Sequence, residues 1–369
     1  MKAKGYGNQM AEKYLKVMIE KVKPDLCILT GDILDGRPFG EYKRLDWKET
    51  FLSFIDPLIK NKIYWSYTPG NHDDDGSPYT RKDLLAIYGL PYCFSKGAKK
   101  WDHTVTVGPN PFECVRLWLF DSGENSPDPK LKYTSFSLDA VHEYKLISKK
   151  LREQKEKAVG LAFFHIPLPE YSYNKPMVGT LGLFDAARRK GNVPAVAKWC
   201  PWLVRLFGFQ RVSGSSNLQS GLYEAFLWER NILATFCGHD HYNDAVMHLY
   251  GLYMCYGRVC SNTPPVTWEG AGGPLPFDLG ARVIEVRGAG KVATWIEGED
   301  GPEKNSLIVM SPEYIPPTST VRKILCHPWT VKIVNLIIVF MILAYLLYYG
   351  DDLTGVDWDD DSEGLIRES

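Results

Sequence analysis

The sequence predicts an α/β fold in which helices cover the faces of a β-sheet. Apolar runs rich in β-branched and aromatic residues recur at residues 26–30, 63–68, 115–120, 160–164 and 232–237, and each ends in a polar cluster. Segments with the pattern of helices lie between several of these runs. Such alternation of strands and helices is typical of an α/β sandwich.

Two segments carry the periodicity of amphipathic helices. Residues 10–22 place apolar side chains, among them Tyr14 and Met18, on one stripe. Residues 137–157 form a longer and more highly charged pattern of the same kind. Both segments are therefore expected to pack one face against the sheet.

Composition narrows the class of protein. The 369 residues are 45% hydrophobic and 24% charged, which is ordinary for a globular chain of one large or two small domains. The formal net charge of -1 provides no basic surplus to follow a phosphate backbone, so no nucleic-acid partner is expected. The 8 cysteines include no CxxC pair, and Cys27 and Cys237 lie in apolar runs, which indicates buried thiols in a reducing compartment.

Residues 1–300 are expected to form the main domain. Within it, residues 171–220 interrupt the strand and helix pattern with prolines and an aromatic patch, and we interpret them as an insertion. The insertion could shape a substrate cleft, lie against a membrane or a partner, or form a packed loop domain. Residues 301–330 are polar and rich in proline, as expected of a linker.

The C-terminal part differs from the rest of the chain. Residues 331–349 read VKIVNLIIVFMILAYLLYY, about the length and composition of a single transmembrane helix; the alternative is a buried amphipathic helix. Residues 350–369 form an acidic tail that we expect to be disordered.

Charges around this apolar run predict its orientation. Arg322, Lys323 and Lys332 precede or begin it, and acidic residues follow it. Basic residues flank membrane helices on the cytosolic side, so the main domain is expected in the cytosol. Residues 1–10 hold no apolar core of a signal peptide; a signal peptide further upstream would place the domain in a lumen or outside the cell.

Polar side chains follow four of the predicted strands and supply oxygen and nitrogen ligands for metals. Side chains at the carboxyl ends of neighbouring strands converge at one edge of an open α/β sheet. A Gly-Asp pair alone is typical of a plain turn, and a lone histidine of a core position; the ordered combination indicates a metal site. The residues concerned are Asp32, Asn71, His72, Asp73, His165, His239 and His241.

The sequence blocks around these residues resemble a known family. GDILDG (31–36), GNHDDD (70–75), FFHIPLPEY (163–171) and FCGHDHYND (236–244) are similar to the calcineurin-like metallophosphoesterases, and especially to their purple-acid-phosphatase-like branch in plants and fungi. The similarity covers residues 10–300. It implies a four-layer αββα sandwich around a site for two divalent or trivalent metal ions, which could be Mn, Fe or Zn.

The resemblance also implies roles for individual residues. Asp32 would bridge both metals, and Asn71, His165 and His239 would complete the first metal site. His241 would bind the second metal. His72 would protonate the leaving oxygen, with Asp73 orienting its imidazole. A hydroxide activated by the two metals would attack phosphorus without a protein nucleophile.

Two departures from the family pattern qualify this expectation. Residues 1–24 contain no histidine or aspartate, whereas the family supplies an Asp-x-His block upstream of its Gly-Asp block. Either the sequence begins too late to include the block or the protein lacks it. Asp35 stands where purple acid phosphatases have an iron-binding tyrosine.

The leading hypothesis is a metal-dependent phosphatase; the alternative is a catalytically impaired, membrane-tethered binding protein.

Overall fold

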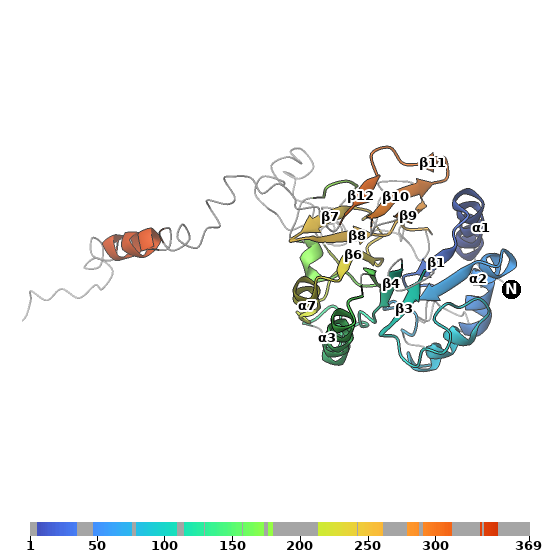
Figure 1. Cartoon of the computed structure of the whole chain (residues 1–369), viewed down its shortest axis with the longest axis horizontal. Coiled ribbons are helices and arrows are strands. Elements are labelled where there is room, and N and C mark those ends of the chain that lie inside the picture. Colours follow the sequence, from blue (N-terminus) through green and yellow to red (C-terminus); the bar gives the residue numbers. More distant parts are fainter. Residues whose placement is uncertain are drawn as a thin grey trace, which may run out of the picture. The chain divides into compact units, whose positions relative to one another are not determined.

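The structure is a computed structural model, and it describes residues 6–34, 47–75, 79–108, 114–128, 130–156, 158–172, 176–179, 213–241, 243–260, 279–287, 291–311, 333 and 336–345. The chain divides into two units, Met1–Tyr314 and Ile315–Ser369. Figure 1 labels most of the helices and strands of the first unit. This unit holds all the elements described below except the helical residues between 333 and 345.

A six-stranded mixed sheet forms the centre of the first unit. Four of its strands are parallel, and the two at its edges, β3 and β7, run antiparallel to their neighbours. In spatial order the strands are β3 (His103–Val107), β4 (Val115–Leu119), β5 (Val159–Phe164), β6 (Ile232–Cys237), β8 (Leu252–Tyr256) and β7 (Val246–Leu249).

A second layer of strands packs on one face of this sheet. It contains the parallel pair β1 (Leu26–Leu29) and β2 (Tyr64–Tyr67) and an antiparallel sheet. The antiparallel sheet consists of β9 (Gly280–Arg287), β10 (Lys291–Gly298), β11 (Gly301–Pro302) and β12 (Ile308–Met310). Apolar side chains of both layers, such as Phe236 and Val292, form one buried cluster.

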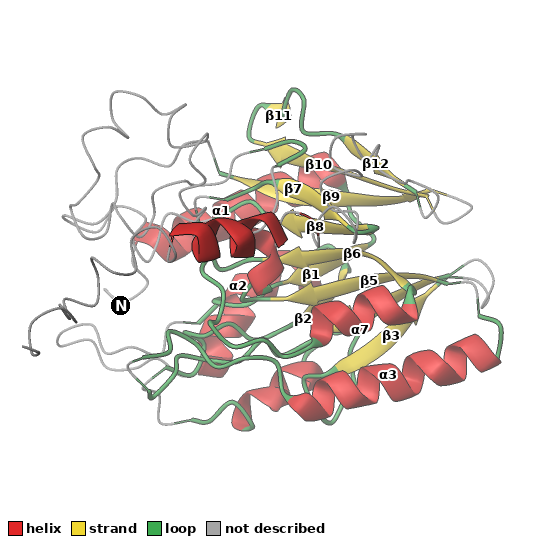
Figure 2. Ribbon diagram, turned by 90° about the vertical axis from the view of Figure 1, so that its left-hand side faces the viewer, coloured by secondary structure: helices red, strands yellow, loops and turns green. Residues whose placement is uncertain are grey.

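Helices cover the two outer faces. On one side, Tyr144 of α3 (Leu138–Glu153) and Phe226 of α7 (Leu222–Glu229) pack against the six-stranded sheet. On the other, α1 (Tyr6–Val22) and α2 (Trp47–Lys60) pack with β1, β2 and the 3-10 helix η1 (Asp83–Gly89). Figure 1 shows strands between these two groups of helices, and Figure 2 shows the same elements from the side, with helices in red and strands in yellow. The order of layers is therefore helix, sheet, sheet, helix.

The elements expected from the sequence are present. The five predicted apolar runs correspond to β1, β2, β4, β5 and β6, and the two amphipathic segments to α1 and α3. The hydroxyl of Ser137 accepts a hydrogen bond from the Ala140 N–H at 3.0 Å and so caps the start of α3. The α/β sandwich is confirmed.

Several predicted segments lie partly or wholly outside the described residues. These include residues 173–175 and 180–212 of the predicted insertion, residues 312–330 of the linker and all of the acidic tail. Of residues 331–349, the structure describes Ile333 and 336–345 as helical. In the described part of the chain, no helix combines the length and apolar character needed to cross a bilayer.

Candidate metal centre

Four loops bring the predicted ligands together from both sheets. Asp32 follows β1 and Asn71 follows β2, which are parallel neighbours in one layer. His165 follows β5 directly and His239 lies two residues after β6, and these strands are parallel neighbours in the other layer. Because the carboxyl ends of the strands meet here, four residues far apart in the sequence share one site.

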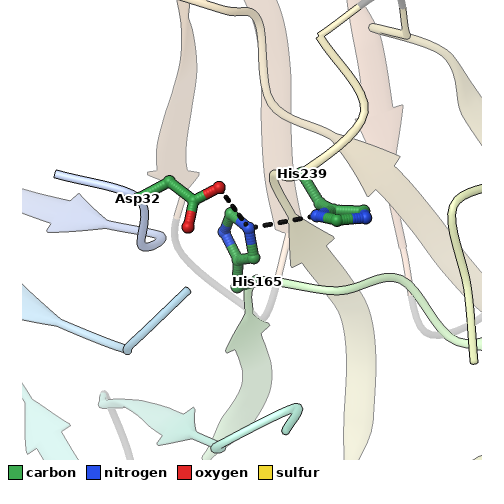
Figure 3. A group of neighbouring side chains, drawn as sticks. All are labelled: Asp32, His165 and His239. Carbon is green, nitrogen blue, oxygen red and sulfur yellow. Dashed lines mark hydrogen bonds and ion pairs between the residues drawn. The ribbon is translucent and has the colours of Figure 1, made fainter. Parts of the chain in front are cut away.

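Atoms able to bind a metal converge on His165. Its Nε2 lies 3.0 Å from Asp32 Oδ2, 3.2 Å from Asn71 Oδ1 and 3.2 Å from His239 Nδ1. Figure 3 shows the His165 ring between the Asp32 carboxylate and the His239 ring. The ligand atoms of Asp32, His165 and His239 all lie within 4.8 Å of one another.

The hydrogen bonds around these atoms explain why a cation fits among them. His165 Nδ1 lies 2.6 Å from the carbonyl oxygen of Thr30, which only accepts, so Nδ1 carries a proton. In the neutral ring, Nε2 therefore presents a lone pair toward a carboxylate oxygen and an amide oxygen. Such a group of acceptors is unfavourable unless a cation lies between them. Two imidazoles, a carboxylate and an amide oxygen suit Zn, Mn or Fe.

Electrostatics favours the ligand forms of these side chains. Burial alone would raise the pKa of Asp32, but His165 and, to a lesser extent, His72 and His239 hold it well below its usual range. Burial and the charge of His165 lower the pKa of His239 well below its usual value. Asp32 is thus anionic and His239 neutral at neutral pH, the forms that bind metals.

The pKa of His165 is shifted upward by its neighbour. Burial would lower this pKa, but the nearby Asp32 carboxylate outweighs burial and raises it. Because a metal binds the neutral imidazole, metal binding at His165 would be coupled to proton release.

Two glycines allow the loops to approach one another this closely. A Cβ on Gly31, whose φ is +85°, would lie 2.6 Å from Gly70 Cα and 2.7 Å from His165 Nδ1. A Cβ on Gly70 would lie 2.8 Å from Asp32 Cγ. No side chain fits at either position without displacing a ligand, which explains the glycine before Asp32 and before Asn71.

The backbone of two ligands is strained. Asp32 has a φ of 52° and His239 a φ of 68°, in the left-handed region that residues other than glycine rarely adopt. Strained backbone of this kind is concentrated at functional sites, where surrounding contacts maintain it. For Asp32 one such contact is the hydrogen bond from the His72 N–H to Asp32 Oδ1, at 2.9 Å.

His72 is paired differently from the expectation. Its Nδ1 lies 3.0 Å from Asp75 Oδ2, whereas the buried Asp73 carboxylate accepts hydrogen bonds from backbone N–H groups instead. The structure thus pairs the His72 imidazole with Asp75, whereas the sequence pattern pointed to Asp73. The physical reason is that backbone donors surround Asp73 on the buried side of the loop. A sequence pattern of three consecutive aspartates does not show which one faces the histidine.

His241 is not part of the group whose ligand atoms all lie within 4.8 Å of one another. It belongs to the loop after β6 and is half-buried. Its charge is close enough to contribute to the lowered pKa of His239. Among the described residues, the structure thus brings together one group of His and carboxylate ligands, with Asn71 beside it, and leaves His241 outside that group.

Two further residues near the site were not expected from the sequence. Arg81 donates hydrogen bonds to Asp121 Oδ2 and Asp74 Oδ1, at 2.9 and 3.0 Å, and so joins two loops of the site. The Tyr133 ring packs edge-on against the His239 ring, with centroids 4.7 Å apart. In the sequence, the Asp-Ser pair at 121–122 that follows the apolar run 115–120 is typical of a plain loop start, so it does not mark this loop as part of a site.

Comparison with known proteins places the chain in a family. The model of the calcineurin-like phosphoesterases matches residues 7–243, more than half of the chain. The chain belongs to this family. The resemblance inferred from the four sequence blocks is thereby confirmed, and the four converging ligands lie within the matched residues.

Distant relatives in the family include plant and yeast proteins. The "probable inactive purple acid phosphatase 29" of Arabidopsis thaliana is 25% identical over 269 residues, which cover 66% of this chain and 61% of that protein. The "phosphatase DCR2" of Saccharomyces cerevisiae is 29% identical over 271 residues, covering 67% of this chain and 41% of that protein. The chain thus spans less than two thirds of either relative.

The solved structures that are similar to this chain are more distant in sequence. A dimetal phosphatase from Danio rerio is 12% identical, with a TM-score of 0.49 and coverage of 82% of this chain and 88% of that one.

Proposed function

We propose that this family member is a metal-dependent phosphoester hydrolase, and specifically a phosphatase that acts on phosphomonoesters of small molecules or proteins. The observation that carries the proposal is the convergence of three metal-binding atoms, from Asp32, Asn71 and His239, on His165 Nε2 at the carboxyl ends of β1, β2, β5 and β6. The yeast relative that bears the name phosphatase supports the same activity class.

Different residues of the site would bind the metals and donate the proton during hydrolysis. Asp32, Asn71, His165 and His239 would hold one metal, and His241, with Asp32 as the bridge, would contribute to a second. Bound cations would supply an activated water and neutralise the phosphate oxygens. His72 is held through Nδ1 by Asp75, which leaves Nε2 to donate a proton to the leaving oxygen.

Activity of the purified chain tests this proposal. With Mn²⁺, Zn²⁺ or Fe²⁺ and an aryl phosphate, we expect hydrolysis that Asn71→Ala and His239→Ala each lower by about 100-fold or more, because each removes a direct ligand. His142→Ala, which removes an exposed histidine of α3, serves as the matched control and should not change the rate. Hydrolysis that is insensitive to Asn71→Ala and His239→Ala would refute the proposed site.

A second candidate is a catalytically impaired binding protein that keeps the fold and one metal. It is favoured by the plant relatives, which are named probable inactive purple acid phosphatases, and by the position of His241 outside the converging group. Metal content separates the two candidates. Two metals per chain with turnover support the enzyme, whereas one metal without turnover supports the binding protein.

We also propose that residues 331–349 anchor the chain in a membrane as a single-pass helix, with the catalytic domain in the cytosol. The apolar composition, interrupted only by Lys332 and Asn335, and the basic residues at its start support this topology. Carbonate extraction and protease protection of the full chain test it, with a variant lacking residues 331–349 as the control. A chain released by carbonate would contradict the anchor, and a protected domain would indicate a lumenal or extracellular location.

A further inference from the structure

The loop that follows β4 contacts the metal ligands although it contributes none of the four. Ser122 Oγ accepts a hydrogen bond from the Ile166 N–H at 2.8 Å, next to His165. Further along the same loop, Tyr133 packs against His239. Between these two contacts lies Asn125, whose side chain reaches the loop that holds Asn71 and His72.

Asn125 makes three hydrogen bonds with that loop. Its Nδ2 lies 3.2 Å from the backbone oxygen of Asn71 and 3.2 Å from Asp75 Oδ2. Its Oδ1 lies 3.0 Å from Asn71 Nδ2. The single amide of Asn125 therefore contacts both a metal ligand and the carboxylate that pairs with His72.

The chemistry of these partners determines which way each amide faces. A backbone carbonyl and a carboxylate only accept hydrogen bonds, so the atom of Asn125 between them is its NH₂ group. The oxygen of Asn125 must then face Asn71 and accept from the Asn71 NH₂ group. As a result the Asn71 oxygen, rather than its nitrogen, faces His165 Nε2 at 3.2 Å. An amide binds a metal through oxygen, so this orientation is the one that the site requires.

The same amide acts on His72 through Asp75. Asp75 Oδ2 accepts from Asn125 and lies 3.0 Å from His72 Nδ1. Asp75 is half-buried, with 30% of its side chain exposed, so a second contact is needed to fix the carboxylate on the histidine side. Asn125 provides that contact.

We propose that Asn125 is a positioning residue that turns the Asn71 oxygen toward the metal and holds the Asp75 carboxylate on His72. The effect on the orientation of Asn71 is inferred from the ligand geometry alone. The effect on His72 rests on the proposed phosphatase function, in which His72 donates a proton to the leaving oxygen.

Three variants of the full chain separate these effects. Asn125→Leu has a similar size but neither donates nor accepts. Asn125→Asp keeps an oxygen for the Asn71 NH₂ group but loses both donors. Asp75→Asn keeps an oxygen for His72 and Asn125 but loses the charge. Glu124→Gln, an exposed neighbour in the same loop, is the matched control.

Zn²⁺ affinity, measured by competition with a chromophoric chelator, reports on Asn71. We expect Asn125→Leu to weaken Zn²⁺ binding about tenfold, because loss of an outer contact to a metal ligand typically lowers metal affinity 10- to 100-fold. The affinities of Asn125→Asp, Asp75→Asn and Glu124→Gln should stay within about threefold of the parent. Equal affinity of Asn125→Leu and the parent, or equal losses in Asn125→Leu and Asn125→Asp, would overturn the role assigned to the amide.

The dependence of rate on the leaving group reports on His72. An alkyl phosphate needs a proton on its leaving oxygen, whereas a nitrophenyl phosphate does not. Asn125→Leu, Asn125→Asp and Asp75→Asn should each lower the alkyl rate about tenfold more than the nitrophenyl rate. Equal losses on both esters would overturn this part. If the parent hydrolyses neither ester, the proposed function fails and Zn²⁺ affinity alone decides the inference.

Circular dichroism and the thermal midpoint establish that each variant is folded before it is compared. If Asn125→Leu does not fold, Asn125→Ala takes its place, since it also lacks the amide but adds no bulk to the loop. The expected loss and the overturning result are the same for both substitutions.

Discussion

At the scale of single residues, Asp73 organises the backbone of the metal centre without being one of its ligands. Its carboxylate accepts hydrogen bonds from the N–H groups of Asp32, Leu34 and Gly70, at 2.8, 2.8 and 2.6 Å. The side chain is fully buried, so water cannot replace these bonds. Asp73 therefore fixes the loop after β1 to the loop after β2.

Removal of this carboxylate should destabilise the fold. Asp73→Ala leaves three N–H groups without their acceptor, two of them buried, and we expect the free energy of unfolding to fall by about 3 kcal/mol or more. Urea denaturation of the metal-free chain measures the change. Asp56→Ala, which removes the partner of exposed Lys60, should cost less than about 0.5 kcal/mol. Similar effects of the two substitutions would contradict the role given to Asp73.

Asp102, which is not a metal ligand, should make the stability of the fold depend on pH. Burial raises its pKa from 3.8 to about 6, the nearby Asp121 adds to this effect, and a hydrogen bond from the Asp121 N–H opposes it. Because the folded state holds the proton more tightly than the unfolded state, the contribution of Asp102 to stability is present below pH 3.8 and is lost as the pH rises through about 6.

Asp102→Asn should remove this loss. The free energy of unfolding of the variant should match that of the parent at low pH. At pH 7 it should be higher by about 2 kcal/mol, a figure reduced to allow for the partial exposure of Asp102. Denaturation curves collected between pH 4 and 8 in the presence of a chelator provide the measurement. A difference that does not change with pH would show that Asp102 titrates normally in the folded protein.

Some of these residue roles could be predicted from the sequence and others could not. Asp32 lies three residues after β1 and His165 directly follows β5, so the rule that strand ends converge was enough to place them together. Asp75 and Asn125 are 50 residues apart and meet through loop conformations that no periodicity encodes. The turn-forming tendency of both residue types also favours a plain loop interpretation.

At the scale of elements, Arg81 joins the loops that follow β2 and β4. Besides its ion pairs with Asp74 and Asp121, it donates to the backbone oxygens of Gly70 and Gly123, at 2.9 and 2.6 Å. Only 14% of its side chain is exposed. The planar guanidinium with five donors can serve four acceptors at once, which lysine cannot.

Replacement of Arg81 should separate the two loops. Arg81→Met leaves two carboxylates without their partner, and we expect a loss of about 3–5 kcal/mol in the free energy of unfolding. Arg287→Met, at an exposed ion pair with Glu285, should change stability by less than about 0.5 kcal/mol. The two are compared by chemical denaturation. A small effect of Arg81→Met would mean that the loops hold their positions independently.

The sequence predicted the central strands better than the peripheral ones. β5 and β6 are six-residue apolar runs with nearly every residue buried, so their composition is distinctive. β7 and β12 have only four and three residues, and β3 alternates threonine with valine under partial exposure. Such short or mixed segments also occur in turns, and pairing with a neighbouring strand decides their structure.

At the scale of the whole molecule, the metal centre connects the two sheet layers. Asp32 and Asn71 come from the layer of β1 and β2, and His165 and His239 from the six-stranded sheet. A metal held by all four would join the layers. Because such a site does not exist in the unfolded chain, metal binding should add directly to stability.

Thermal unfolding tests this coupling. Zn²⁺ at about 100 times its dissociation constant should stabilise the parent by about 2.7 kcal/mol and raise its unfolding midpoint. His165→Ala should remove most of the increase, whereas the control His142→Ala should keep it. A Zn²⁺ effect that persists in His165→Ala would place the metal elsewhere in the chain.

The most direct measurement is anomalous diffraction from crystals of the chain grown with Zn²⁺ or Mn²⁺. We predict a peak between the two sheet layers, with Asp32 Oδ2, Asn71 Oδ1, His165 Nε2 and His239 Nδ1 each about 2.0–2.2 Å from a zinc ion. Absence of a peak at these four atoms, or an ion bound only by other residues, would contradict the proposed metal centre.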